Sequence, residues 1–418
     1  MKRIFLLVPF FFFVLTLHAQ QSNFLPEQGP EKNSFLITSD FFVASNSITY
    51  ELAKTYFLKG FITNVMKDRV SKHLEDRNRL GGEFTTEMYF RHKSDSMFGS
   101  KNWSWFTGIK NIDHVNAVYS RDLFELYFRG NKNYAGKKAD FSGFNYLLLK
   151  YQQVQFGLSK LFMNDSVTCE FGGAIGFNAG QQLQRIQSEK SDLFTEETGE
   201  YLDVNANVEL HTSDSLHKDF GSFNGFGMST DLFFRETFNK KLFFFIRISN
   251  LGFILWNSRS AEIKADTSFR FEGIEVNDLF SFADSVKSTI AVDSSFVQPF
   301  LTNRKYHTYT LFLPAKIELS YKQLVGHEHM RAGLGMIYFL HADYLPQLHM
   351  DFDYSWNKNM FTINLTFGGY APFGAGIFYE HHFNHGYMLK CGSNSINSWF
   401  DINNSRFQHV SAAISRNF

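Results

Sequence analysis

Two histidine-rich turns contain residues of the types that bind metal ions. EHHFNH and GHEHM supply seven candidate metal ligands: Glu380, His381, His382, His385, His327, Glu328 and His329. A metal site needs three or four nitrogen or oxygen ligands that converge on one ion at about 2.1 Å. Adjacent residues of a strand point to opposite faces, so His381 and His382 cannot easily share an ion. The sequence therefore predicts histidines that serve in turns, with no metal and no other cofactor.

Motifs of known enzymes do not support catalysis either. Neither GxSxG nor HExxH occurs, and Ser, His and Asp are plentiful but scattered, which leaves a hydrolase open but unsupported. Glycine pairs such as Gly172-Gly173 lie within alternating segments, whereas a dinucleotide site needs a helix that opens on the glycines. The 41 basic and 41 acidic residues balance and are dispersed. We therefore predict a protein that is not an enzyme and that binds no nucleic acid.

Charged residues on alternating faces are the most informative candidates. In QLHMDFDYSW the apolar residues occupy every second position, and the positions between them are mostly polar or charged. The same pattern recurs in EFTTEMYFR, TCEFGGAIGFN and MFTINLTF, which indicates strands with one apolar and one polar face. In a barrel, the polar face lines a lumen, where such charges either form packing ion pairs or border a water path. The lumen-lining candidates are Glu87, Arg91, Glu170, His349, Asp351 and Asp353.

Composition favours a membrane barrel over a soluble sandwich. Aromatic residues make up 18% of the chain, with 51 Phe and 18 Tyr, yet the mean hydropathy is only −0.23. Strands with one apolar and one wet face give this combination. We predict an all-β fold: a transmembrane antiparallel β-barrel of roughly fourteen strands over residues 79–418. A soluble β-sandwich is the alternative, because the sequence does not show which side of each strand is wet.

The N-terminal residues predict export followed by a helical segment. Residues 1–20 read as a signal peptide, with Lys2 and Arg3 before an apolar run. Residues 21–78 are expected to form a plug or hatch that contains an amphipathic helix over about residues 56–75. The apolar face of this helix includes Phe57, Phe61, Val65 and Met66. The alternative is an ordinary amphipathic core helix.

Turn lengths predict which ends of the strands lie together. The short breaks QLVGHEH, WNKN and FNHG alternate with longer ones, and counting back from Phe418 assigns the short set to the periplasmic side. The same count makes the long connection 261–307 extracellular, and helical spacing within it indicates local structure. Phe418 ends the last strand as the residue expected to serve barrel assembly. Cys169 and Cys391 lie in strand-like runs and are expected to be free thiols.

Longer blocks of sequence carry a family likeness. They are RLGGEF, DLFELYFRGNKNYAGKKADFS, KYQQVQFGL, FNGFGMSTDLFF, SNLGFILWN, FRFEGIEVNDLFSFADS and GGYAPFGAGIFYEHHF. Over residues 35–418 the chain resembles an uncharacterised, domain-of-unknown-function family of outer-membrane proteins of Bacteroidota-type bacteria. The resemblance implies a monomeric barrel of roughly fourteen strands, broadly similar to long-chain fatty-acid transporter-like barrels with an N-terminal hatch. It implies no activity and no catalytic residues.

Two functions follow from these expectations. The first is a plugged outer-membrane channel for the uptake of small hydrophobic molecules, which rests on analogy of fold. The alternative is a non-enzymatic accessory or structural subunit of a larger outer-membrane secretion or assembly complex. The expected partners are outer-membrane lipid, the barrel-assembly machinery, and either a small hydrophobic ligand or an outer-membrane protein complex.

Overall fold

One continuous antiparallel sheet closes on itself to form the body of the molecule. The computed structural model describes residues 31–214, 221–272, 304–326 and 328–418. The predicted signal peptide and residues 273–303, the centre of the long connection, lie outside this description. The first strand pairs with the last along Ser34–Ala44 and with the second along Asn33–Ser45, so this sheet edge is closed. The predicted β-barrel fold is confirmed.

Fourteen strands form the closed wall of the barrel. They are β1 (Asn33–Ser45), β2 (Arg77–Lys93), β3 (Trp103–Ser120), β5 (Asn145–Met163), β6 (Val167–Thr195), β8 (Gly225–Phe238), β9 (Leu242–Trp256), β13 (Ala315–Leu324), β14 (Met330–Leu340), β15 (Gln347–Trp356), β16 (Asn359–Gly368), β17 (Phe373–His382), β18 (Tyr387–Ser393) and β19 (Phe407–Asn417). Their number agrees with the predicted count.

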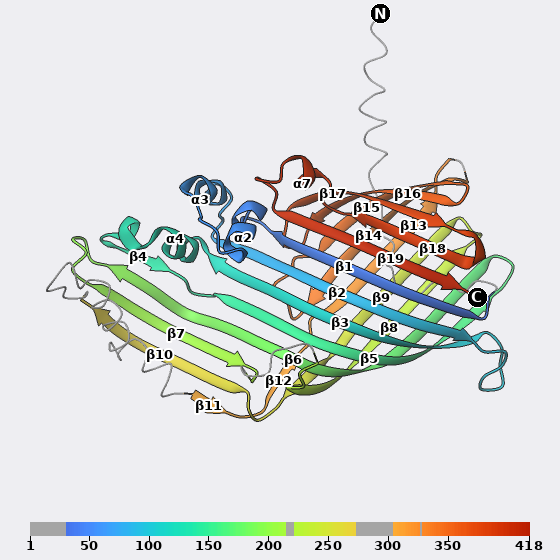
Figure 1. The fold of residues 1–418 in the computed structure, drawn as a ribbon, viewed down its shortest axis with the longest axis horizontal. Coiled ribbons are helices and arrows are strands. Elements are labelled where there is room, and N and C mark those ends of the chain that lie inside the picture. The colour runs from blue at the N-terminus through green and yellow to red at the C-terminus, as the bar shows by residue number, and fades with distance from the viewer. Residues whose placement is uncertain (1–30, 215–220, 273–303, 327) are drawn as a thin grey trace, which may run out of the picture.

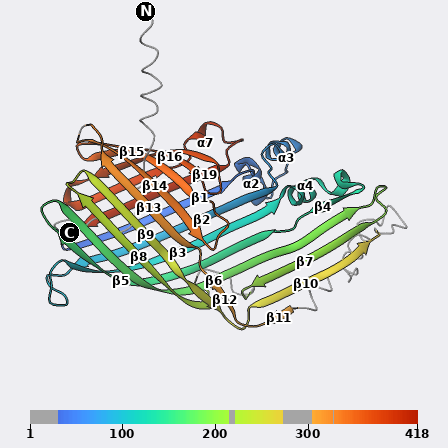
Figure 2. The ribbon, with the colours of Figure 1, turned by 180° about the vertical axis from the view of Figure 1, so that it is seen from behind.

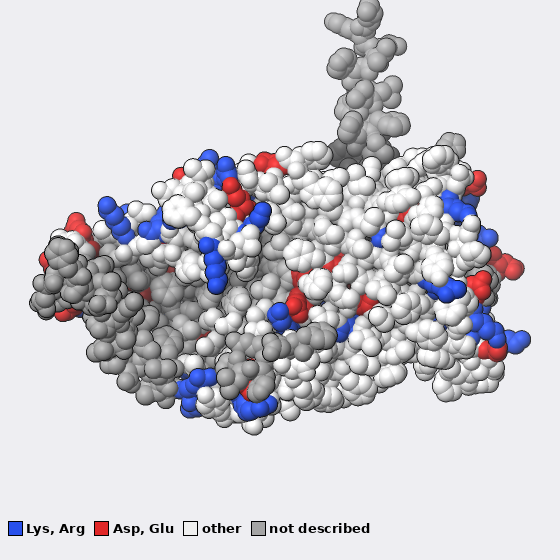
Figure 3. Space-filling view, viewed as in Figure 1, with Lys and Arg blue, Asp and Glu red and all other residues white. Residues whose placement is uncertain are grey.

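The wall has its apolar side outward and its polar side inward. In β16, Phe361 and Ile363 are exposed, whereas Thr362 and Asn364 between them are buried. Ile363 is 55% exposed and Asn364 is fully buried, which is the reverse of a soluble protein. On the face seen in Figure 3, charged residues gather near the C-terminal end, and much of the wall beyond them is uncharged. Such an exterior suits contact with hydrocarbon.

The connections sort partly by length between the two ends of the barrel, the exception being residues 94–102 between β2 and β3, which form a longer connection at the end that carries Phe418. At the end that carries Phe418, called the Phe418 end, β5–β6, β8–β9, β13–β14, β15–β16 and β17–β18 are joined by turns of two to five residues. The segments QLVGHEH, WNKN and FNHG all lie there, as the strand count predicted. The opposite end, called the loop end, carries the long connections (Figure 1).

Short helices lie at the loop end. α2 (Tyr50–Phe57) and α3 (Asn64–Ser71) connect β1 to β2, and α4 (Arg121–Arg129) follows β3. η1 (Asn131–Tyr134) and β4 (Lys137–Asp140) lead on to β5, and α7 (Asn397–Phe400) precedes β19. η3 (Asn384–Gly386) lies instead at the Phe418 end, in the turn before β18. The side chains of Leu52, Val70, Leu74, Tyr119 and Phe124 form a small core among these elements.

The predicted single plug segment is wrong for the residues that the structure describes. Residues 33–45 form wall strand β1, so residues 21–78 are not one unit. The helix predicted over 56–75 is broken near Lys59, whose φ is +55°, and Thr63 then caps a new helix. Among the predicted plug residues, Met66 packs against the small helical core, whereas Phe57, Phe61 and Val65 are exposed. They lie at the loop end and line no part of the interior cavity.

The same sheet extends from the wall beyond the barrel. The first half of β6 pairs with β8, but from Gln184 onward β6 pairs with β7 (Leu202–Thr212). β7 pairs in turn with β10 (Ala261–Phe271), and β10 with β11 (Arg304–Tyr306). β12 (Tyr309–Phe312) returns the chain to β9 and the wall. Figures 1 and 2 show this extension projecting past the loop end.

Three remaining sequence features have defined positions. The described helices include none with the length and apolar character needed to span a membrane. Cys169 and Cys391 are free, as predicted. The aromatic side chains of Trp105, Tyr354 and Trp356 are exposed on strand segments near the Phe418 end.

Candidate functional site: the barrel interior

Near the Phe418 end, aromatic rings cross the interior of the barrel. Tyr89, Phe106, Phe233 and Phe245 come from four strands and are all buried, and we call them the aromatic layer. The rings fit because glycines face them on neighbouring strands. A Cβ at Gly157 would lie 2.2 Å from the Phe106 ring, so any side chain there would displace the ring. Aromatic rings that pack against glycines thus fill the lumen at this depth.

A buried ion-pair cluster adjoins the aromatic layer. The Arg91 guanidinium donates to a Glu170 carboxylate oxygen and, over 2.8 Å, to the Ser159 hydroxyl. Arg235 approaches the other Glu170 oxygen at 3.5 Å. Because these side chains are at most 10% exposed, their charges depend on one another for compensation.

A second network crosses the middle of the barrel. The Lys110 ammonium lies 2.7 Å from the Asp231 carboxylate, which also lies 3.3 Å from Arg247. Arg247 reaches Glu318 at 3.7 Å, and Glu318 pairs with Lys316 at 2.9 Å. The positive and negative groups alternate, so the network links β3, β8, β9 and β13 across the lumen.

A third cluster centres on Lys322. Its ammonium lies 2.7 Å from Asp353 and 3.3 Å from Asp351. Thr362 donates to Asp353 over 2.7 Å, and the Asn364 amide donates to Asp351 over 2.5 Å. Lys322, Asp351 and Asp353 are at most 4% exposed. Two carboxylates share one ammonium, so removal of Lys322 would leave both without it.

The interior at the loop end is mainly apolar instead. Leu149, Leu183, Ile254, Trp256 and Leu313 belong to one buried cluster on the β3–β5–β6–β9 side, and Leu313 directly follows β12. On the opposite side, Phe339 and Phe407 pack with two tyrosines from connecting loops. This end is therefore filled by side chains that make few directional bonds.

The two loop tyrosines form what we call the tyrosine lid. Tyr344 lies between β14 and β15, and Tyr370 lies between β16 and β17. Their ring centroids are 4.9 Å apart in a T-shaped arrangement, and Tyr344 makes a similar contact with Phe339 at 5.0 Å. Tyr370 rests on the backbone of Gly81, where a Cβ would lie 2.1 Å from the ring. Both tyrosines are buried although they belong to loops.

A cavity of about 150 Å³ lies between the tyrosine lid and the charged networks. Its apolar lining includes Phe42, Phe339 and Phe407 together with the lid, and its charged lining includes Lys316, Lys322 and Lys390 with nearby carboxylates. The Tyr370 hydroxyl is buried and makes no hydrogen bond with the residues that the structure describes. The cavity is therefore amphipathic, with one buried polar group that is open to a ligand or to water.

The predicted lumen residues lie on the inner face of the wall. Glu87, His349 and Asp351 line the cavity. Arg91, Glu170 and Asp353 lie in the buried ion-pair clusters. The six candidates do not form one site, because Arg91 and Glu170 pair with each other, whereas Asp351 and Asp353 pair with Lys322. Whether any of them contacts a solute stays a prediction.

Sequence reasoning missed several residues of the interior. Lys110, Asp231, Arg247 and Lys322 alternate with outward apolar residues, so the same period-two pattern could have identified them. Tyr344 and Tyr370 carried no such signal, because they lie in loops whose paths depend on the closed barrel.

The histidine-rich turns have ordinary polar contacts. His381 pairs with the Asn359 side chain at 2.7 Å, and His382 with Glu380 at 2.8 Å. His327 lies outside the described residues. Phe418 lies beside Asn33, with which it exchanges two backbone hydrogen bonds of 2.9 Å. Its expected role in barrel assembly stays a prediction.

Several solved structures of other proteins are similar to this chain. The TodX deltaS2S3 mutant monoaromatic hydrocarbon channel is 8% identical, with 93% of this chain and 91% of that chain covered, at a TM-score of 0.45. The toluene transporter TodX of Pseudomonas putida is 8% identical, covering 93% and 90%, with a TM-score of 0.43. A FadL homologue of Pseudomonas aeruginosa is 8% identical, covering 93% and 90%, with a TM-score of 0.40.

A search of curated proteins gave no match. A family profile, by contrast, matches residues 33–400 and so spans nearly all of the barrel. That range includes the aromatic layer, the three ion-pair clusters and the tyrosine lid. The chain therefore belongs to the family described as "Family of unknown function (DUF5723)".

Proposed function

We propose that this protein is an outer-membrane channel that admits small amphipathic molecules from the loop end into its interior cavity. The observation that carries the proposal is the cavity itself, which has an aromatic lining below the tyrosine lid and a charged lining beneath it. An apolar body would pack against the rings while a polar group met the lysines and carboxylates or the Tyr370 hydroxyl.

The outer-membrane location is part of the proposal. A closed β-barrel satisfies the hydrogen bonds of its wall between strands, and the exposed residues of this wall include many large apolar side chains, which suits contact with hydrocarbon. The longer connections lie at the loop end, which by the usual asymmetry of such barrels faces the cell exterior.

The described structure represents a closed state of this channel. The aromatic layer fills the lumen near the Phe418 end, and the tyrosine lid covers the cavity at the loop end. Passage therefore requires the lid to move first. In this proposal the lid limits the rate of entry from the loop end, and it can move because its rings come from loops rather than from wall strands.

Solute flux and binding test the proposal together. Purified protein is reconstituted in liposomes, and swelling is measured with p-toluenesulfonate, benzyltrimethylammonium and, as a polar control of similar size, arabinose. Calorimetry measures binding of the same probes in detergent. We expect a Tyr344→Ala/Tyr370→Ala variant to pass one of the aromatic ions faster than arabinose. Binding of neither ion, together with swelling equal to that of protein-free liposomes, would overturn the proposal.

A second candidate function is that of an accessory subunit in an outer-membrane complex. The observation that favours it is an exposed apolar patch on the helices at the loop end, formed by Phe57, Leu58, Phe61, Val65 and Tyr127. Exposed patches of this kind mark interaction sites. Co-purification of a stoichiometric partner that is lost on Phe57→Ser/Phe61→Ser substitution, with no solute flux in any variant, would support this function over transport.

A further inference from the structure

A cluster of histidines and carboxylates lies on the extension, away from the barrel interior. In the register of β7 and β10, His211 pairs with Glu262 and Glu209 pairs with Lys264, so the four side chains share one face of the sheet. His307 follows β11 and donates its backbone N–H to the Ser260 carbonyl oxygen. Two strands and the returning chain thus bring their polar side chains together.

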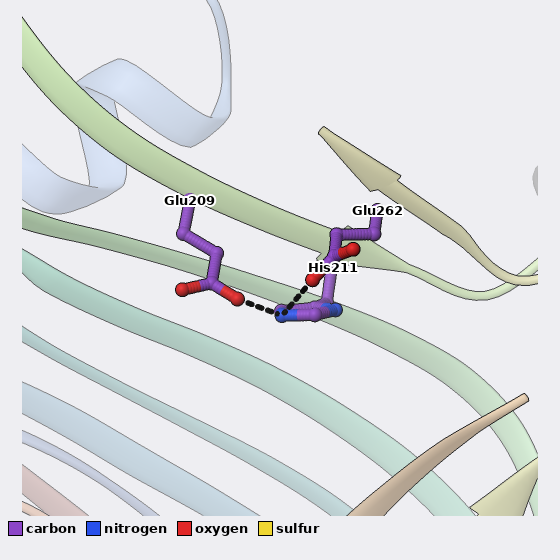
Figure 4. A group of neighbouring side chains, drawn as sticks. All are labelled: Glu209, His211 and Glu262. Carbon is purple, nitrogen blue, oxygen red and sulfur yellow. Dashed lines mark hydrogen bonds and ion pairs between the residues drawn. The ribbon is translucent and has the colours of Figure 1, made fainter. Parts of the chain in front are cut away.

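The potential ligand atoms are close to one another. His211 Nε2 lies 2.7 Å from Glu209 Oε1 and 3.8 Å from Glu262 Oε1. The ligand atoms of these three residues all lie within 4.8 Å of one another. Figure 4 shows the imidazole of His211 between the two carboxylates. His307 Nε2 adds a second imidazole, 3.1 Å from Glu262 Oε2.

The two imidazole rings are held in place from behind. His307 Nδ1 lies 2.7 Å from the Thr308 carbonyl oxygen, which can only accept, so Nδ1 carries a hydrogen. Nε2 then faces the Glu262 carboxylate and needs a proton or a metal ion between them. A hydrogen bond from the far ring nitrogen to a carbonyl is also how metal-bound histidines are commonly oriented. The His211 ring stacks on Tyr309, with centroids 3.9 Å apart.

A lysine ammonium currently neutralises the carboxylates. Lys264 Nζ lies 3.0 Å from Glu262 Oε1 and 3.2 Å from Glu209 Oε1. Its side chain is 61% exposed, whereas that of His211 is only 7% exposed. Lys264 can therefore turn into solvent, while His211 stays where it is.

We propose that Glu209, His211, Glu262 and His307 bind a divalent transition metal of the zinc class, and that the ion displaces the Lys264 ammonium. Two nitrogen and two oxygen ligands suit a four-coordinate zinc ion. Because Glu262 and His307 stand near the two ends of the connection 261–307, the ion would join those ends to β7. The site is structural in this proposal, since all four positions are taken by protein ligands.

Zinc binding by the full, untagged protein tests the proposal. The metal-free protein is titrated with zinc chloride by calorimetry, and bound zinc is measured by mass spectrometry after dialysis. We expect His211→Ala and His307→Ala each to weaken binding by at least about tenfold, since loss of even an outer-shell partner costs that much. Lys264→Met should tighten binding, because it removes the competing cation.

Controls separate this site from other histidines and from misfolding. Arg270→Met changes an exposed cation of the same extension and should leave zinc affinity unchanged. His381→Ala removes a histidine from the turns at the Phe418 end and should also have no effect. Mobility before and after heating on a detergent gel verifies that each barrel is folded. Wild-type protein with less zinc than one ion per ten chains, or folded His211→Ala and His307→Ala variants with wild-type affinity, would overturn the proposal.

Discussion

The two ends of the barrel are filled in different ways. Near the Phe418 end, rings carried by wall strands press on glycine backbone, and buried ion pairs lie beside them. At the loop end, apolar and aromatic side chains close the interior, and two of them come from loops. The first arrangement can open only if its rings turn aside within the wall, whereas the second can open by movement of two loops. The comparison indicates that the loop end is the gated one.

The largest expected effect is at a buried charge. Lys322→Met leaves Asp351 and Asp353 without their shared ammonium, and we expect it to lower the free energy of unfolding by about 3–5 kcal/mol. Urea unfolding in detergent, followed by tryptophan fluorescence, measures this loss. The matched control is Lys264→Met on the exposed extension, which should leave barrel stability close to that of wild type. Equal effects of the two substitutions would contradict the assignment of Lys322 to a buried cluster.

The next effect tests the aromatic layer. Gly157→Ala places a Cβ 2.2 Å from the Phe106 ring and 2.7 Å from the Gly173 carbonyl oxygen. Overpacking of this kind destabilises by about 1–3 kcal/mol, so we expect a lower unfolding midpoint with no gain in solute flux. Gly199→Ala, at a surface turn where a Cβ would meet no atom within 4 Å, controls for the loss of a glycine, although its φ of +84° adds local strain. Increased solute flux through the folded Gly157→Ala variant would mean that the gate lies near the Phe418 end and not at the loop end.

Removal of a lid ring should affect permeability more than stability. Tyr370→Ala removes a T-shaped aromatic contact that contributes about 0.5–1.5 kcal/mol beyond its buried area. We expect liposome swelling with an aromatic ion to increase several-fold over wild type. Tyr127→Ala, at an exposed tyrosine of α4, serves as the comparison and should leave swelling unchanged. No difference between these two variants would show that Tyr370 does not limit entry.

The smallest change separates lid displacement from loss of the ring. Gly81→Ala keeps both tyrosines but puts a Cβ 2.1 Å from the Tyr370 ring, so the ring must shift. We expect swelling between that of wild type and that of Tyr370→Ala. Because Gly81 and Gly157 both face an aromatic ring, the pair tests the two ends directly. If both alanine variants raise flux equally, the distinction between the two ends is wrong.

The sequence by itself determined the wall of the barrel. Period-two alternation in segments such as MFTINLTF determined which side chains share the apolar face of a strand, because neighbouring residues of a strand must point to opposite sides. Turn lengths indicated which strand ends lie together. The period-two alternation also placed Asp351 and Asp353 on the polar face of their strand. These are local properties, so they could be read without knowing how the sheet closes.

Only the tertiary structure decided what fills the lumen and where the helices lie. The pairing of Lys322 with Asp353 depends on which strands become neighbours, and Tyr370 reaches Gly81 only because the sheet closes. The amphipathic pattern of residues 56–75 gives an apolar face without giving its partner. In the structure only α3 lies within this range, and it packs with α2 and α4 in the small core at the loop end. Contacts between residues distant in sequence have no local signature, and the interior of this barrel consists of such contacts.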